Sequence, residues 1–383
     1  MDNPSCNPYL PTIVDEIRSS PVYLRFLQLL RDFNINRIID CHAHISSGQL
    51  ETIAGAPSDL VPQHPFTIAD VNYLYRRLFL NEGMRFSSVV FDTPLPVYDL
   101  ANKNDQLLRY WQEMDPADRA EILPFAVVTP DMDLKQILRW VEKGARGFKM
   151  TPRTTSTHVK RGVIADVTLS EMLSPEALWV ADQSGLPLII HLPQLVVSPR
   201  IRQSLKDELL LLAARYSRIK LVLAHLGQAQ TPAKMEDLLN LIQGNGLTDI
   251  IWMDISAVTV PSVLAMALES DVRLMFGSDI DFALVERGRY VTFKVIDGKR
   301  VLASGDDNGN LITALVSQNF GMQLRHFVVE AGIDLNAPLM VFQFEGIIDA
   351  VERLRARGIQ GETIKAKLQN LLSGNALSLF NNY

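Results

Sequence analysis

Short apolar runs of strand length alternate along most of the chain with longer segments of helical period. Most of these runs are continuously apolar instead of alternating, as expected for parallel strands that are covered on both faces. Strand-length runs separated by helical segments predict repeated βαβ units. The eight runs are RIIDCHAH, FSSVVFD, ILPFAVV, ARGFKM, LPLIIH, IKLVLAH, DIIWMDIS and VRLMFGSD.

Eight parallel strands with intervening helices favour a closed (β/α)8 TIM barrel of the α/β class over an open doubly wound sheet. No G-x-G-x-x-G motif follows the first run, which also argues against a dinucleotide-binding fold. A length of 383 residues fits one barrel with insertions. We therefore expect an N-terminal helical extension over residues 1–35 and a single barrel domain over residues 36–383.

The segments outside the eight runs predict further elements. An amphipathic helix pattern in IVDEIRSSPVYLRFLQLLRDF forms a cap that packs against the barrel. C-terminal helical segments are expected at about residues 311–331, 338–357 and 361–380. Long connections at about 151–170 and 281–310 follow the C-terminal ends of strands, where a barrel carries its active site.

The second long connection contains RYVTFKVIDGKRVLAS, in which apolar and polar residues alternate on both sides of an Asp-Gly pair. This pattern predicts a β-hairpin with a tight turn at Asp297–Gly298. Because it follows the last strand, we predict that it forms a lid over the site. Packing against a neighbouring subunit, in a homo-oligomer, is the alternative.

Composition narrows the class of partner. The net charge is −6 and no Lys/Arg block is present, which argues against nucleic acid and favours a small-molecule substrate. No apolar run is long enough to span a bilayer, and the first residues lack the pattern of a signal peptide, so a cytoplasmic location is expected. Cys6 and Cys41 are too few for a disulfide framework or a thiolate metal site. Any metal must therefore bind His and carboxylate side chains.

The first run carries two histidines at i and i+2. Side chains alternate along a strand, so residues 40, 42 and 44 are expected to point into the barrel, with Cys41 and Ala43 facing the helices. His42 and His44 would then form half of a site for a divalent metal. Two core histidines satisfied by hydrogen bonds are the alternative for an isolated H-x-H.

Other candidate ligands end other strands. His191, His225 and Asp279 each follow an apolar run, where inward-pointing side chains would meet His42 and His44 at the mouth of the barrel. Buried imidazoles and carboxylates are costly without a shared cation. The pattern therefore predicts a divalent metal site.

These motifs resemble the amidohydrolase superfamily, specifically the amidohydrolase-2 branch that includes decarboxylases related to aminocarboxymuconate semialdehyde decarboxylase. The resemblance covers about residues 36–380. One departure is Asp281, where many relatives have proline. The motifs that carry the resemblance are DCHAH, GARGFKM, IIHLP, LAHLG, FGSD and SGNALSLF.

The resemblance implies one divalent ion, zinc or alternatively manganese, and a catalytic set that includes His225 and Asp279. It makes His225 an acid/base or the ligand of a second metal. In binuclear relatives a lysine at the position of Lys149 is carbamylated, whereas this branch favours an unmodified cation that lines the substrate pocket. The implied metal ligands are His42, His44, His191 and Asp279.

Other polar residues carry weaker signals. Arg153 and Arg161, together with His158 and Lys160, make the connection after the fourth strand basic, which would suit a substrate carboxylate if the loop is not simply solvated. Asp254 could orient site residues or cap its strand. His64 and His326 lack ligand spacing and are expected to be structural.

The predicted function is a metal-dependent hydrolase that attacks a small, carboxylated amide, ester or lactone with activated water. The first alternative is a metal-dependent, non-oxidative decarboxylase of an unsaturated or aromatic carboxylic acid. A non-catalytic metal-binding barrel and a metal-free lactonase of the same branch are further alternatives.

Overall fold

The computed structural model describes residues 7–46, 66–95, 98–155, 167–192, 199–296, 299–303, 312–317 and 322–380. All eight predicted strands are present, the third of them interrupted at Phe125. The strands are β1 (Arg37–Ile45), β2 (Arg85–Asp92), β3 (Ile122–Pro124), β4 (Ala126–Val127), β5 (Phe148–Met150), β6 (Pro187–Ile190), β7 (Lys220–Leu223), β8 (Ile251–Asp254) and β9 (Arg273–Met275).

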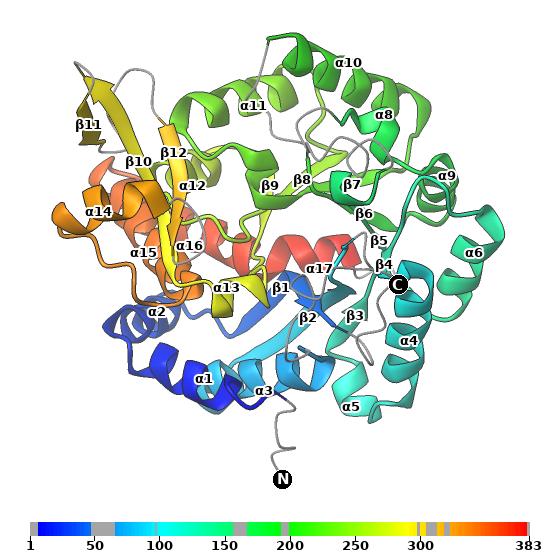
Figure 1. Ribbon diagram of the computed structural model, residues 1–383, viewed down its shortest axis with the longest axis horizontal. Helices are drawn as coiled ribbons and strands as arrows, with labels where there is room; N and C mark the ends of the chain where they lie inside the picture. The colour runs from blue at the N-terminus through cyan, green and yellow to red at the C-terminus, as the bar shows by residue number, and fades with distance from the viewer. Residues whose placement is uncertain are drawn as a thin grey trace.

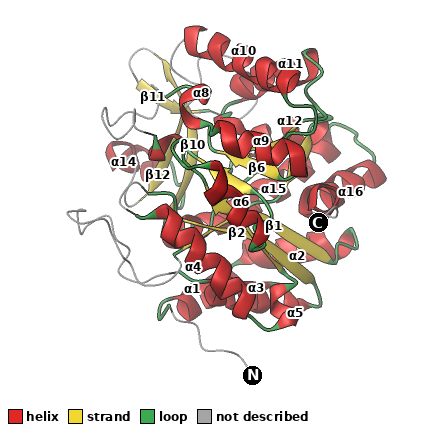
Figure 2. Ribbon diagram, turned by 90° about the vertical axis from the view of Figure 1, so that its right-hand side faces the viewer, coloured by secondary structure: helices red, strands yellow, loops and turns green. Residues whose placement is uncertain are grey.

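The strands pair in parallel in chain order and close into a ring. Strands β1 to β3 form one sheet and β4 to β9 another. The two sheets are joined where the backbone N–H of Phe125 donates to the carbonyl oxygen of Val90 at 2.8 Å. The ring closes where the N–H of Cys41 donates to the carbonyl oxygen of Phe276, also at 2.8 Å. Helices surround the strands (Figures 1 and 2), and the predicted barrel is confirmed.

The expected alternation along β1 is wrong at two positions. The register against β2 shifts between Asp40 and Ala43, which marks a β-bulge. Cys41 packs in the interior cluster of the barrel, with its Sγ 3.7 Å from the Sδ of Met275. Asp40 turns outward and accepts a hydrogen bond from the hydroxyl of Tyr75. His42 still points inward, because the extra residue of the bulge returns the side chains after it to the expected alternation.

The helices cover the outside of the barrel (Figure 2). The predicted N-terminal helical pattern forms two helices, because Pro21 starts a new helix whose first turn is capped by the Ser20 hydroxyl. The helices before β9 are α1 (Leu10–Ser19), α2 (Pro21–Asp32), α3 (Ile68–Leu78), α4 (Leu100–Glu113), α5 (Pro116–Arg119), α6 (Leu134–Glu142), α8 (Leu169–Met172), α9 (Pro175–Ser184), α10 (Pro199–Arg215), α11 (Pro232–Gly244) and α12 (Pro261–Glu269). The helices after β9 are α13 (Phe282–Val285), α14 (Met322–Glu330), α15 (Leu339–Ala356), α16 (Gly361–Gln369) and α17 (Asn375–Phe380).

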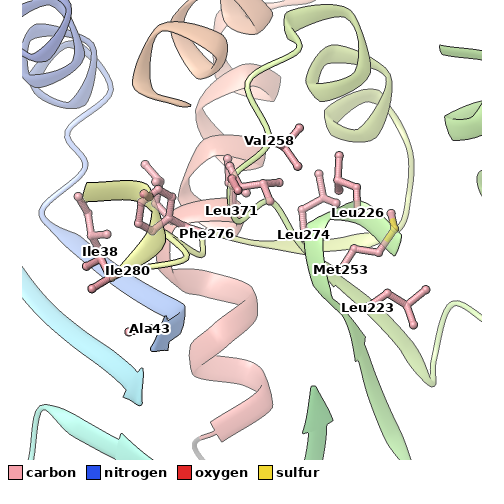
Figure 3. Close-up of a cluster of buried hydrophobic side chains, with 14 of the residues drawn as sticks. Ile38, Ala43, Leu223, Leu226, Met253, Val258, Leu274, Phe276, Ile280 and Leu371 are labelled. Carbon is pink, nitrogen blue, oxygen red and sulfur yellow. The ribbon is translucent and has the colours of Figure 1, made fainter. Parts of the chain in front are cut away.

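Two hydrophobic layers hold the barrel wall. The outer layer lies between strands and helices, and Figure 3 shows part of it, with Leu226, Met253 and Leu274 gathered beside one another. The inner layer fills the barrel and includes Phe380 of the C-terminal helix α17. The ring of Phe380 meets that of Phe125 edge to face at 6.0 Å between centroids. Helix α17 therefore plugs the barrel.

The predicted hairpin is confirmed in its strands. Strand β10 (Gly288–Ile296) pairs antiparallel with β11 (Lys299–Leu302), while Asp297–Gly298 lie outside the described residues. The helix expected at 311–331 is wrong in its first part, because β12 (Ile312–Ser317) pairs with the other edge of β10. This three-stranded sheet lies to one side of the barrel (Figure 1).

Candidate active site

Three candidate ligands meet where β1 and β9 end. His42 and His44 lie on β1, with their Nε2 atoms 3.2 Å apart. An Oδ1 oxygen of Asp279, which follows β9, lies 3.5 Å from His42 Nε2 and 3.3 Å from His44 Nε2. The backbone N–H of Asp279 donates to the carbonyl oxygen of His42 at 2.8 Å, so the two segments are fixed together by the main chain.

The other two histidines approach from β6 and β7. His225 Nε2 lies 3.2 Å from His191 Nδ1. His225 also joins His42 and Asp279 in a group whose ligand atoms lie within 4.8 Å of one another. All five side chains proposed from the sequence therefore gather at the C-terminal ends of the strands.

Asp254, at the end of β8, orients the imidazole of His42 and holds the backbone of His225. Its Oδ2 oxygen lies 3.0 Å from His42 Nδ1, and its Oδ1 oxygen accepts from the backbone N–H of His225 at 3.1 Å. Burial alone would raise the pKa of Asp254, but the charge and hydrogen bond of His42 hold it below the usual range. A carboxylate at Nδ1 places the proton there and turns the lone pair of Nε2 toward the site.

Ser256 completes this support. Its backbone carbonyl oxygen lies 2.9 Å from Nδ1 of His225, so that nitrogen carries the proton and Nε2 faces the site. Its hydroxyl lies 3.2 Å from Nδ1 of His42. Residues 252, 254 and 256 share a strand face by the period of two, so the pattern of WMDIS also predicts Ser256 beside Asp254.

Lys149 lies inside the site and is buried. Its Nζ is 3.0 Å from His42 Nε2 and 4.7 Å from the centroid of the Phe91 ring. Burial lowers the pKa of Lys149 to about 8. Burial, and next the charge of Lys149, lower the pKa of His42 to about 3, so this imidazole is neutral at physiological pH. A neutral imidazole is the form that binds metal.

The basic connection after β5 is described only in part. Arg153 lies exposed in a short 3-10 turn. Burial is the main cause that lowers the pKa values of His191 and Lys149, and the charge of Arg153 adds a smaller effect in the same direction. His158, Lys160 and Arg161 lie outside the described residues, as does His64. His326 is exposed on α14, with its Nε2 atom 2.9 Å from an Oε1 oxygen of Glu330.

The side chains fit a divalent ion. The group of His42, His225 and Asp279 brings two imidazoles and one carboxylate together, and the Nδ1 atoms of both imidazoles are held by the protein on the far side. Nitrogen and carboxylate ligands at such spacing are those of zinc and similar ions.

Comparison with known proteins identifies the family. A family model described as amidohydrolase matches residues 39–294, and the chain belongs to this family. The predicted resemblance, and with it the class of metal-dependent hydrolase, is confirmed. No curated protein matches the sequence. Within the described residues, no helix is both long enough and apolar enough to cross a membrane.

Solved structures resemble the chain at a distance. A protein assigned as a 2-pyrone-4,6-dicarboxylic acid hydrolase from Acinetobacter baumannii is 16% identical, with a TM-score of 0.47 over 91% of this chain and 100% of that chain. A 4-oxalomesaconate hydratase from Rhodopseudomonas palustris is 14% identical, with a TM-score of 0.49 over 90% and 95%. An amidohydrolase from Burkholderia multivorans with bound zinc is 14% identical, with a TM-score of 0.47 over 90% and 99%.

Proposed function

We propose that the protein hydrolyses a small, carboxylated amide, ester or lactone with one divalent ion, zinc, held by His42, His44, His191 and Asp279. The observation that carries this proposal is the meeting of His42 Nε2, His44 Nε2 and Asp279 Oδ1 within 3.5 Å of one another, with Asp254 behind His42. When bound, a divalent ion supplies Lewis acidity and lowers the pKa of water to near neutrality.

His225 is the proposed acid/base. Because its Nδ1 faces the carbonyl oxygen of Ser256, its Nε2 carries the lone pair that faces the site. That nitrogen can take a proton from water and deliver it to the leaving group. An acid/base must be held in place to transfer protons, and hydrogen bonds to Asp254 and Ser256 hold His225.

Basic side chains are proposed to bind the substrate carboxylate. Lys149 offers a buried cation beside His42, and Arg153 offers an exposed guanidinium whose charge reaches the same site. Arg161 is proposed to join them from the same connection. The free, buried thiol of Cys41 suits a cytoplasmic enzyme, as proposed from the composition.

One set of measurements tests the proposal. Elemental analysis of protein purified without chelator should give about one zinc ion per chain, and chelation should abolish the hydrolysis of carboxylated lactones, esters or amides. Two ions with a carbamylated Lys149 would overturn the mononuclear site. Full activity without metal would identify a metal-free lactonase. Release of carbon dioxide from unsaturated carboxylic acids would identify the decarboxylase, and bound metal without turnover would identify a binding protein.

A further inference from the structure

The segment after β7 has an unusual backbone. His225, Leu226, Gly227 and Gln228 all have positive φ, at 56°, 51°, 58° and 66°. Only glycine adopts this left-handed region without steric cost, so the other positions need compensating contacts. Runs of this kind persist where the surrounding structure determines them, and they cluster at functional sites.

Three of the four residues are held by contacts already described or by packing. His225 is fixed by Asp254 and Ser256. Leu226 is fully buried in the outer hydrophobic layer (Figure 3). A Cβ atom at Gly227 would lie 3.0 Å from Leu238 Cδ2, so glycine suits both the space and the φ angle there.

Gln228 has a different kind of contact. Its side chain is half-buried, and its amide nitrogen lies 3.3 Å from Nε2 of His191. The other ring nitrogen of His191, Nδ1, lies 3.2 Å from His225 Nε2 and so faces the site. Gln228 therefore touches the one ring atom of His191 that points away from the group.

Without a metal, His191 Nδ1 donates to the lone pair of His225 Nε2, and the Gln228 amide nitrogen donates to His191 Nε2. A ring that presents the lone pair of Nδ1 to a metal carries its proton on Nε2. A glutamine amide offers an acceptor at one end and a donor at the other, so a half turn of the amide lets its oxygen accept that proton. The amide can thus hold the ring in either tautomer without moving it.

We propose that Gln228 is a positioning residue that holds the ring of His191 with Nδ1 available to the metal, and that the left-handed turn is retained for this contact. The inference rests on the proposed function, in which His191 is a metal ligand. It predicts that backbone stability and metal affinity change in opposite directions when Gln228 is replaced by glycine.

The experiment measures Zn²⁺ affinity by chelator competition and thermal unfolding of the metal-free protein. Gln228→Gly should raise the unfolding midpoint, because glycine relieves the left-handed strain, yet weaken zinc binding by about 10- to 100-fold. Asn34→Gly is the matched control, since Asn34 also has a positive φ of 53° but is exposed between α2 and β1. It should raise the midpoint and leave zinc affinity unchanged.

Two further variants separate orientation from backbone effects. Gln228→Glu keeps the reach and an acceptor for the Nε2 proton, so it should bind zinc as well as the native protein. Gln228→Asn tolerates positive φ but is one methylene shorter, so it should lose affinity as the glycine variant does. Native affinity in both the asparagine and glycine variants would overturn the inference.

The failure of the proposed function has a distinct signature. If His191→Ala binds zinc as tightly as the native protein, then His191 is not a ligand and the proposed metal site is wrong. If His191→Ala loses zinc while Gln228→Asn keeps it, only the role of Gln228 is wrong.

Discussion

Asp254 divides its two oxygens between residues that the sequence separates widely. One oxygen accepts from His42 on β1 and the other from the backbone of His225 after β7. The sequence placed Asp254 at a strand end but could not separate an orienting role from a cap, since the spacing of one carboxylate says nothing about its partner. By contrast, His42, His191 and His225 were predicted correctly as neighbours, because strand ends of a barrel meet at one rim.

Replacing Asp254 with Asn tests the orienting role. The amide oxygen should take the position of Asp254 Oδ1, which accepts from the backbone N–H groups of His225 and Ser256 and from the Ser256 hydroxyl. The NH2 group then lies against His42 Nδ1. That group forces the proton of His42 onto Nε2, where it blocks the metal. Zinc affinity, measured by chelator competition, should fall about 10- to 100-fold.

The control for this substitution is Asp249→Asn. Asp249 is 87% exposed in an ion pair with Arg273, so its loss should leave zinc affinity unchanged. Native zinc affinity in the Asp254→Asn protein would show that the hydrogen bond does not set the tautomer of His42.

His225 is predicted to be separable from the ligands. His225→Asn should keep most of the metal and lose on the order of 10²–10⁴ in turnover, the range for general acid/base catalysis. Asp279→Ala and His191→Ala should each lose both metal and activity. The measurement pairs metal content with kcat for each variant.

The geometry makes this comparison decisive, because His225 lies in the same close group as His42 and Asp279. If His225→Asn loses metal as readily as Asp279→Ala, His225 is a ligand and a second metal must be considered.

At the scale of elements, the sequence predicted where the strands lie better than which of their side chains point into the barrel. Eight continuous apolar runs identified the barrel strands, because a strand that is buried on both faces has apolar residues at nearly every position. The bulge in β1 could not be predicted from the sequence, because it depends on distant partners of Asp40, the side chains of Tyr75 and Ser278. Part of the predicted helix is instead β12, because ITALVS becomes a strand only when β10 lies beside it.

The hairpin of β10 and β11 belongs to an element whose role is still a prediction. A cavity of about 250 Å³ lies between β10 and the loop after β8, lined in part by Thr259, Val260, Val291 and Thr292. That loop also carries Ser256, so the sheet packs next to a segment that supports the site. We predict from this placement that the hairpin acts in substrate entry.

Shortening the hairpin tests that role. Replacing residues 294–301 with a Gly-Ser pair removes its outer end and keeps the pairing of residues 288–293 with β12. We expect KM to rise or substrate preference to change while metal content stays the same. Unchanged kinetics with a smaller species in size-exclusion chromatography would instead make the hairpin an interface between subunits.

For the whole molecule, the two ends of the barrel serve different purposes. Site residues follow the C-terminal ends of the strands, whereas Phe125 faces the start of β5 and β6, where a Cβ at Gly147 would meet its ring at 2.3 Å. Phe380 packs on Phe125, so α17 closes the end away from the site. Asn375 anchors this helix by donating to the carbonyl oxygen of Leu274 at 2.8 Å. The motif SGNALSLF thus has a structural role, because its Asn375 and Phe380 hold α17 in the end of the barrel.

The plug predicts that stability and metal binding can be separated. Phe380→Ala empties the space beside Phe125 and should lower the free energy of unfolding by about 3–5 kcal/mol, the usual cost of removing a buried aromatic ring. Zinc affinity should stay at the native value, because the cavity opens at the opposite end of the barrel. Ser378→Ala on the exposed side of the same helix is the control and should change neither quantity. Denaturant unfolding of the metal-free proteins, with chelator competition on the same samples, makes the comparison. A loss of zinc affinity in Phe380→Ala that matches its loss of stability would mean that the two ends of the barrel are coupled.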